Sequence, residues 1–181
     1  VIRDIDIDHA GNVYLASSRQ SGTYPGAIES AFQLGFQKTP KGSQDGVVAK
    51  VKSDGSQLVW ATHLGGSNAE GSSPSIRVDT QGNMYYLVST TSQNMPTTPG
   101  CDQTFNGNRD IYVAKLSPNG NNLLYGTYIG GSAIEWDGVH QLALDNSGNL
   151  FVVFFTVSQD LPIVNGYQSR FGGGNSDGHG F

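Results

Sequence analysis

The sequence is poor in cysteine, in charge and in long apolar runs, and each shortage excludes a class of protein. Its single cysteine, Cys101, rules out an intramolecular disulfide and a cysteine-rich metal site. Charged residues make up 14% of the 181 residues, with a formal net charge of −5 and no basic run. Nucleic-acid binding depends on clustered Lys and Arg, so it is not expected. The longest apolar stretch, Leu150 to Phe155, is too short to span a bilayer.

Glycine and aromatic residues, by contrast, are plentiful. The chain has 25 glycines, roughly double the average share of about 7%, which indicates many tight turns. Aromatic residues reach 10%, which argues against disorder. The combination is typical of an all-β protein with short strands and unlike a helical bundle. No G-x-S-x-G serine motif, phosphate-binding loop or zinc motif is present, so no catalytic residue is assigned.

The chain is built from an internal repeat. Residues 45–67 recur as residues 110–132, at an offset of 65 without a gap, and both copies contain Val-Ala-Lys and end in Gly-Gly-Ser. A second signature, Asp-x-x-Gly-Asn, occurs at 8–12, 79–83 and 145–149. Self-similarity at a fixed period is the mark of a tandem repeat architecture.

Each repeat is predicted to form four strands. In the first complete copy these strands are 47–51, 58–64, 75–78 and 84–89. Asp54-Gly55 and Asn119-Gly120 read as hairpin turns. The apolar runs Met84 to Val88 and Leu150 to Phe155 indicate strands that are covered on both faces. Small four-stranded sheets stacked face to face are the blades of a β-propeller.

We therefore predict an all-β fold of propeller blades, four-stranded antiparallel sheets in an incomplete ring of about three blades. The expected limits are 1–44 for the second half of a blade plus a connector, 45–109 and 110–176 for complete blades, and 177–181 for the start of the next. Seven repeats of this period would need about 460 residues. The expected partners are therefore other parts of a longer chain or other protein chains.

The repeat resembles a known bacterial family. The stretch VAKLSPNGNNLLYGTYIGGS at 113–132, followed by DNSGN and accompanied elsewhere by MPTTPG, is similar to the SBBP repeat, which is named for a seven-bladed β-propeller. The resemblance covers nearly the whole chain. It implies a secreted or cell-surface bacterial protein, often multidomain, and no defined activity. The family tends to be acidic after Gly-Gly-Ser.

The first candidate metal ligands are Asp4, Asp6 and Asp8, which alternate along a predicted strand. Alternation places their side chains on one face, and Ca²⁺ prefers hard oxygen ligands of this kind. The alternative is a solvated strand face in which Asp8 caps a turn.

The second candidate group follows Gly-Gly-Ser in the two copies and consists of Glu70, Glu135 and Asp137. Loops on one rim of a propeller converge, so these carboxylates are candidate ligands for the same ion. The alternative is ordinary solvated loop charge. Ca²⁺ is the ion that such carboxylates would bind, and no other cofactor is expected.

Exposed aromatic residues are the candidates for ligand binding. Trp136 lies in a loop, and Tyr24 and Tyr167 lie in connections between blades. Aromatic rings of this kind stack on sugars or on partner proteins. The alternative is that they fold back over the blade edges.

Three functions stay open on the sequence alone. The preferred one is a non-catalytic surface or secreted module, a scaffold for adhesion or for protein or glycan binding. The second is a propeller-type lyase or glycosidase with its active site at the ring centre. The third is a structural subunit or cargo of a larger extracellular assembly.

Overall fold

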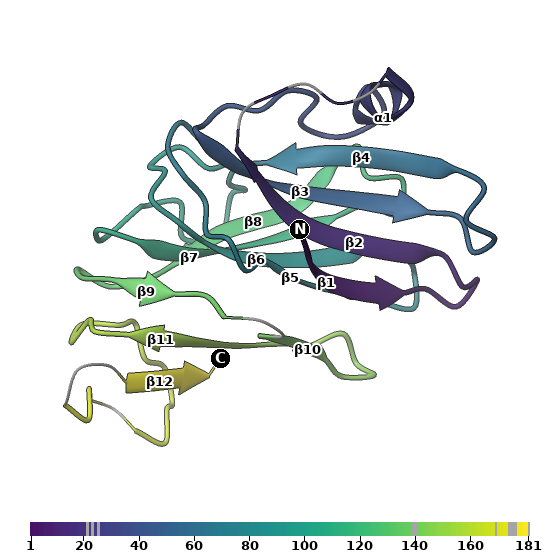
Figure 1. The fold of residues 1–181 in the computed structure, drawn as a ribbon. Coiled ribbons are helices and arrows are strands. Elements are labelled where there is room, and N and C mark those ends of the chain that lie inside the picture. Colours follow the sequence, from purple (N-terminus) through teal and green to yellow (C-terminus); the bar gives the residue numbers. More distant parts are fainter. Residues whose placement is uncertain are drawn as a thin grey trace.

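The computed structural model describes residues 1–20, 22, 24, 26–138, 141–168, 170–173 and 177–180. Their regular structure is almost entirely β and forms three antiparallel sheets that stack on one another (Figure 1). The predicted fold class is confirmed: the chain is all-β, its sheets are propeller-like blades, and the stack does not close into a ring.

The three sheets follow one another along the chain. The first has the order β1-β2-β3-β4, with β1 (Ile2–Ile7), β2 (Val13–Gln20), β3 (Gln44–Val51) and β4 (Leu58–Leu64). The second has the order β5-β6-β7-β8, with β5 (Ser75–Val78), β6 (Met84–Thr90), β7 (Asp110–Leu116) and β8 (Leu123–Ile129). The third has the order β10-β11-β12, with β9 (Glu135–Trp136) also paired to β11, and contains β10 (Leu142–Leu144), β11 (Leu150–Thr156) and β12 (Asp177–Gly180).

The sheets are out of phase with the predicted blades. The first two sheets each join the last two strands of one sequence unit to the first two strands of the next, and the third sheet joins β10 and β11 to β12 of the following unit, so the limits 45–109 and 110–176 are wrong. The connection 91–109 stays within the second sheet because β6 and β7 pair directly. The chain instead crosses between sheets after Gly-Gly-Ser. β12 pairs with β11 in the third sheet rather than starting a fourth sheet. Residues 174–176 and 181 of these units lie outside the described residues.

Two apolar cores lie between the sheets. The first includes Tyr14 and Trp60 of the first sheet and Tyr86 and Tyr128 of the second. The second core packs the other face of the second sheet, including Leu87, against β11. β6 is buried along its whole length, as its apolar run predicted.

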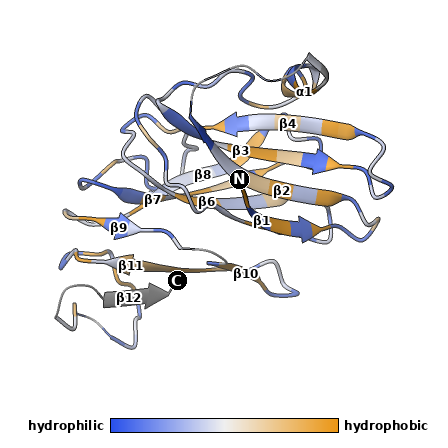
Figure 2. Cartoon of the chain, in the orientation of Figure 1, coloured by the Kyte–Doolittle hydropathy of each residue, from blue (hydrophilic) through white to orange (hydrophobic). Residues whose placement is uncertain are grey.

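The corresponding prediction for the run in β11 is wrong. This strand is hydrophobic along most of its length (Figure 2), but its side chains alternate between buried and exposed. Phe151, Val153 and Phe155 are 50%, 55% and 54% exposed, because no sheet covers that face within the described residues. The outer face of the first sheet also exposes Ile5 and Ile7.

A short helix that the sequence did not predict covers part of that first outer face. Helix α1 (Gly26–Phe32) lies beside β4 (Figure 1). It buries Ala31 and Phe32 against Ala61. The ring of Phe32 stacks on His63 with the centroids 4.4 Å apart. The connection between β2 and β3 therefore acts as a partial lid on the end sheet.

Both predicted hairpin turns are confirmed, and their glycines allow a sharp comparison. Gly55 and Gly120 adopt φ of +71° and +68°, a region that disfavours any residue with a side chain. A β-carbon at Gly55 would meet open space, whereas one at Gly120 would lie 2.4 Å from Cδ2 of Trp60. The β7–β8 turn thus sits directly on the indole of the preceding sheet.

Replacing each glycine by alanine is expected to separate backbone strain from packing. Gly55→Ala should lower the free energy of unfolding by about 1 kcal/mol, the strain of a left-handed alanine. Gly120→Ala should lower it by about 2–4 kcal/mol, because the added methyl also collides with Trp60. Urea unfolding followed by circular dichroism measures both, and equal losses would contradict the contact between turn and indole.

Candidate functional site

β1 contributes Asp4 and Asp6 to its boundary with the second sheet. Asp4 Oδ2 accepts a hydrogen bond from the backbone N–H of Ile76 at 3.0 Å, and Asp6 Oδ2 accepts one from Val78 at 2.8 Å. Arg77 adds an ion pair with Asp4 at 3.0 Å. β5 is an edge strand, and edge strands present unpaired N–H groups. The two carboxylates therefore accept hydrogen bonds from backbone N–H groups at the edge of β5.

Asp8 caps the turn that follows β1. It accepts a hydrogen bond from the backbone N–H of Asn12 at 2.9 Å and forms an ion pair with Lys50 at 3.0 Å. Burial opposes ionisation, but hydrogen bonds from Asn12 and Lys50 outweigh it and lower the pKa of Asp8 to about 2. The next turn repeats the arrangement with Asp79 and Lys115 at 3.2 Å. The predicted turn-capping role of Asp8 is confirmed.

Asp4, Asp6 and Asp8 thus face three separate sets of partners. Across the described ranges, no group of three or more His, Cys, Asp and Glu side chains is arranged to hold a metal ion. The predicted alternative of a solvated face is wrong for Asp4, which is only 2% exposed. These carboxylates join neighbouring strands and turns.

Glu70 links the loop after β4 to the end of β6 through side-chain hydrogen bonds. Its Oε1 accepts hydrogen bonds from Thr90 Oγ1 at 3.0 Å and from Ser92 Oγ at 2.6 Å, at the end of β6. Ser92 Oγ also accepts the backbone N–H of Asn68 at 2.9 Å. A buried carboxylate is stable in this position because hydroxyl donors replace the water that it loses.

Glu135 repeats this arrangement one sheet further on. Its Oε1 accepts hydrogen bonds from Thr156 Oγ1 and Ser158 Oγ, both at 2.6 Å, and Ser158 Oγ accepts the N–H of Ala133 at 2.9 Å. We call each such set a carboxylate clasp: a buried Glu that accepts hydrogen bonds from the Thr at the end of a strand and from the Ser two residues after it. Glu70 and Glu135 are 2% and 0% exposed, so the alternative of solvated loop charge is wrong for both.

Each clasp contains a second carboxylate that is not among the predicted site residues. In the first clasp it is Asp45, which accepts the backbone N–H of Gly42 at 2.9 Å. A β-carbon on Gly65 would lie 2.5 Å from Asp45 Oδ1 and 2.6 Å from Glu70 Oε2. The two carboxylates therefore lie side by side against Gly65. They leave no room for a side chain there, which explains why the first residue of Gly-Gly-Ser is a glycine.

The second clasp pairs Glu135 with Asp110 over Gly130 in the same way. A β-carbon on Gly130 would lie 2.6 Å from Asp110 Oδ1 and 2.8 Å from Glu135 Oε2. Asp45 and Asp110 are the residues that open the two copies of the repeat. Their strict repetition at the same offset as Glu70 and Glu135 was the sequence signal for this pairing.

Burial changes the protonation of both pairs. Burial, with a smaller contribution from the charge of Asp45, raises the pKa of Glu70 to about 7 against the hydrogen bonds from Ser92 and Thr90. Burial likewise raises the pKa of Asp110 to about 6, with an added contribution from the charge of Glu135. Two adjacent carboxylates in a dry site resist double ionisation, so each pair retains a proton at mildly acidic pH.

Asp137 lies apart from the clasps. Its Oδ1 accepts a hydrogen bond from Ser89 Oγ at 2.8 Å, and its carboxylate approaches Gly71, where a β-carbon would be 2.4 Å from Oδ2. Asp137 therefore joins the third sheet to β6. The three loop carboxylates Glu70, Glu135 and Asp137 each lie at a sheet boundary.

The candidate ligand-binding aromatics have three different environments. Tyr24 stacks on Phe32 at 4.7 Å, with the guanidinium carbon of Arg19 3.4 Å from its ring centroid. This is the predicted alternative, an aromatic ring folded back over a blade edge. Trp136 is half-buried in β9, where it pairs with β11. Tyr167 is fully exposed.

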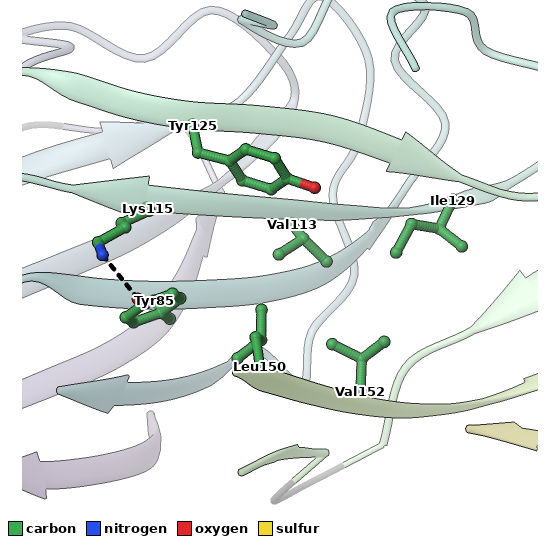
Figure 3. Close-up of a pocket in the computed structure, with 7 residues that line it drawn as sticks. All are labelled: Tyr85, Val113, Lys115, Tyr125, Ile129, Leu150 and Val152. Atoms are coloured by element: carbon green, nitrogen blue, oxygen red, sulfur yellow. Dashed lines mark hydrogen bonds between the residues drawn. The ribbon is translucent and has the colours of Figure 1, made fainter. Parts of the chain in front are cut away.

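An apolar groove lies between the second and third sheets (Figure 3). Its volume is about 360 Å³. The lining residues are Tyr85, Val113, Lys115, Tyr125, Ile129, Leu150 and Val152. Lys115 Nζ donates a hydrogen bond to Tyr85 Oη at 2.6 Å and marks the polar end of the groove.

Comparison with known proteins adds no assignment, since neither a protein-family model nor a curated protein matches the chain. Within the part of the chain that the structure describes, every helix is too short or too polar to cross a membrane.

Proposed function

We propose that the chain is a non-catalytic propeller module of the SBBP type that serves as a rigid scaffold for protein or glycan binding at a bacterial surface. One observation carries the proposal. The first strands of the sheets, β1, β5 and β10, lie next to one another, on the side that would face the axis of a closed ring. A propeller enzyme would need free carboxylates there. Asp4 and Asp6 instead bind the backbone of β5.

An activity screen tests the non-catalytic part of this proposal. The purified chain is incubated with chromogenic glycosides and with polyuronate chains, the substrates of glycosidases and lyases. We expect no turnover above buffer. Turnover that disappears in Asp4→Asn or Asp6→Asn, with the far-ultraviolet spectrum unchanged, would establish an enzyme and overturn the proposal.

Binding is tested separately on a glycan array. Tyr167 is the candidate aromatic with a fully exposed ring, so glycan binding through it should be lost in Tyr167→Ala. Tyr24→Ala is the matched control, because that ring is already stacked on Phe32. Absence of signal across diverse sugars would remove glycans from the proposal and leave protein partners.

A structural subunit is the second candidate, and the open sheet faces favour it. Phe151, Val153 and Phe155 present an apolar stripe on the outer face of β11. Contiguous exposed apolar surface marks interaction or aggregation sites. If the stripe joins subunits, sedimentation velocity should show concentration-dependent association that Phe151→Ser together with Phe155→Ser abolishes.

A further inference from the structure

The chain contains three Asn-Gly pairs, at 106–107, 119–120 and 165–166. In such a pair the asparagine side chain is open to attack by the backbone, because glycine has no side chain that keeps its nitrogen away from the amide carbon. The attack needs a glycine N–H that can give up its proton and a backbone that can bend toward the asparagine side chain. The three pairs share this local chemistry, so a difference in their reactivity comes from the surrounding fold.

The pair Asn119-Gly120 is held in the β7–β8 turn. The Gly120 N–H donates a hydrogen bond to the backbone carbonyl of Ser117 at 2.9 Å, and Asn119 Oδ1 accepts one from Ser117 Oγ at 2.6 Å. Gly120 also lies against the indole of Trp60. The glycine nitrogen, the asparagine amide and the backbone are all fixed, so the hairpin must open before the pair can react.

The pair Asn106-Gly107 is held in the connection between β6 and β7. Asp110 accepts both backbone N–H groups, that of Asn106 at 2.9 Å and that of Gly107 at 3.2 Å, and Asn106 Nδ2 donates to Asp102 at 3.2 Å. The negative charge of Asp110 opposes loss of the Gly107 amide proton. A β-carbon on Gly107 would lie 2.3 Å from the carbonyl oxygen of Ala133, so the backbone has no room to bend.

The pair Asn165-Gly166, in the connection between β11 and β12, has none of these restraints. Asn165 adopts φ of +55° in a bend, and both residues are exposed. Within the residues that the structure describes, the Gly166 N–H donates no hydrogen bond. Gly100 corresponds to Gly166 at an offset of 66 in the connection of the second sheet, and it is also exposed, with open space where a β-carbon would lie. Exposure is therefore a property of this part of the repeat.

We propose that Asn165 is a site of spontaneous deamidation, at which water converts it to aspartate and isoaspartate. The backbone nitrogen of Gly166 bonds to Cγ of Asn165, the Cγ–Nδ2 bond breaks, and the side-chain nitrogen leaves as ammonia with the proton that the Gly166 amide has lost. Water then opens the five-membered imide. Cleavage of the new bond from the Gly166 nitrogen to Cγ gives aspartate, and cleavage of its original bond to the Asn165 carbonyl carbon gives isoaspartate. No electrons are transferred, and water is the sole co-reactant.

The modification changes the charge and the backbone of an exposed surface. Either product carries a new negative charge, and isoaspartate also lengthens the main chain by one methylene group. Val164 is 82% exposed and Tyr167 is fully exposed, so the change falls beside a candidate ligand-binding ring. The proposal goes beyond the proposed function, because the reaction requires neither a protein nor a glycan partner.

Peptide mapping by mass spectrometry with electron-transfer fragmentation tests the proposal, because it follows each asparagine separately and distinguishes isoaspartate from aspartate. The folded chain is incubated at mildly alkaline pH and sampled over several weeks. We expect Asn165 to convert at least about tenfold faster than Asn106 or Asn119, because only those two pairs require local opening of the fold. Conversion at Asn106 or Asn119 as fast as at Asn165 would overturn the proposal.

The same measurement in urea, above the unfolding midpoint, separates the fold from the local sequence. There the three pairs should convert at similar rates. Asn165→Gln should remove the modification from the folded chain, since its longer side chain would have to form a six-membered ring, whereas the matched control Asn119→Gln should leave the rate at Asn165 unchanged. Conversion of Asn165 in urea but not in the folded chain would show that the fold protects this pair too, and the proposal would be wrong.

Discussion

Replacing Trp60 by alanine is expected to lower the free energy of unfolding by about 3–5 kcal/mol. The indole is buried between the first two sheets and packs edge-on against Tyr14 with centroids 6.0 Å apart. It also donates a hydrogen bond to Pro118, so the variant leaves both a cavity and an unpaired carbonyl. Urea unfolding monitored by circular dichroism gives the loss directly.

Tyr125→Ala is the matched control, because Tyr125 occupies the equivalent position on the second sheet. Its ring is more than one third exposed, so its removal should lower stability by less than about 1 kcal/mol. A large difference between the two variants would show that the β7–β8 turn, by covering Trp60, stabilises the boundary between the first two sheets. Equal losses would contradict the comparison between Trp60 and Tyr125.

The strands themselves were predictable because their signals are local. Asp54-Gly55 and Asn119-Gly120 mark hairpins by turn chemistry alone, and β5 was predicted with the bounds Ser75–Val78 that the structure shows. Alternation and turn residues act within a few positions along the chain. They define where strands begin and end without fixing which strands share a sheet.

The grouping of strands into sheets was not predictable by the same means. The loop after Gly65-Gly66 and the connection 91–109 are both polar, glycine-containing segments. Nothing in their local sequence distinguishes a loop that leads to the next sheet from one that joins two strands of the same sheet. The two segments differ in how closely other side chains approach their glycines. Gly65 and Gly66 have no side chain because the carboxylates of Asp45 and Glu70 occupy the space beside the first and Ser92 the space beside the second. That reason becomes visible only once the sheets are stacked.

The carboxylates show the same limit. Asp4 and Asp6 were correctly placed on one strand face, but their partners are backbone N–H groups of β5, about 70 residues away in the sequence. Glu70 follows a glycine-rich turn and so resembles a solvated loop residue. Its burial depends on Thr90 and Ser92, which only the fold brings to it.

The second large expected effect is a loss of stability as the pH rises. The pKa of Glu70 is raised from 4.5 to about 7 in the folded chain, mainly by burial. A group with a raised folded-state pKa contributes its stability fully below its unfolded pKa and loses it as the pH rises through the folded one. The free energy of unfolding should therefore fall by about 3 kcal/mol between pH 4.5 and pH 7 on account of Glu70. Asp110, with its pKa raised to about 6, adds to the fall in an overlapping range.

Glu70→Gln isolates this contribution. The amide keeps an oxygen for Thr90 and Ser92 and can direct its NH₂ group toward the nearby carboxylate of Asp45. The variant should match the natural sequence near pH 4.5 and exceed its stability by about 3 kcal/mol at pH 8, because no charge develops at this position. Asp54→Asn is the control: Asp54 lies in an exposed turn and its pKa is lowered by hydrogen bonds from Ser56, so it titrates below this window. Urea unfolding at half-unit steps from pH 4.5 to 8 measures all three chains. The contrary outcome is a free energy of unfolding that varies with pH in the same way for Glu70→Gln, Asp54→Asn and the natural sequence. That outcome would show that Glu70 does not bind the proton and that the Asp45–Glu70 pair beside Gly65 is fully ionised in the folded chain.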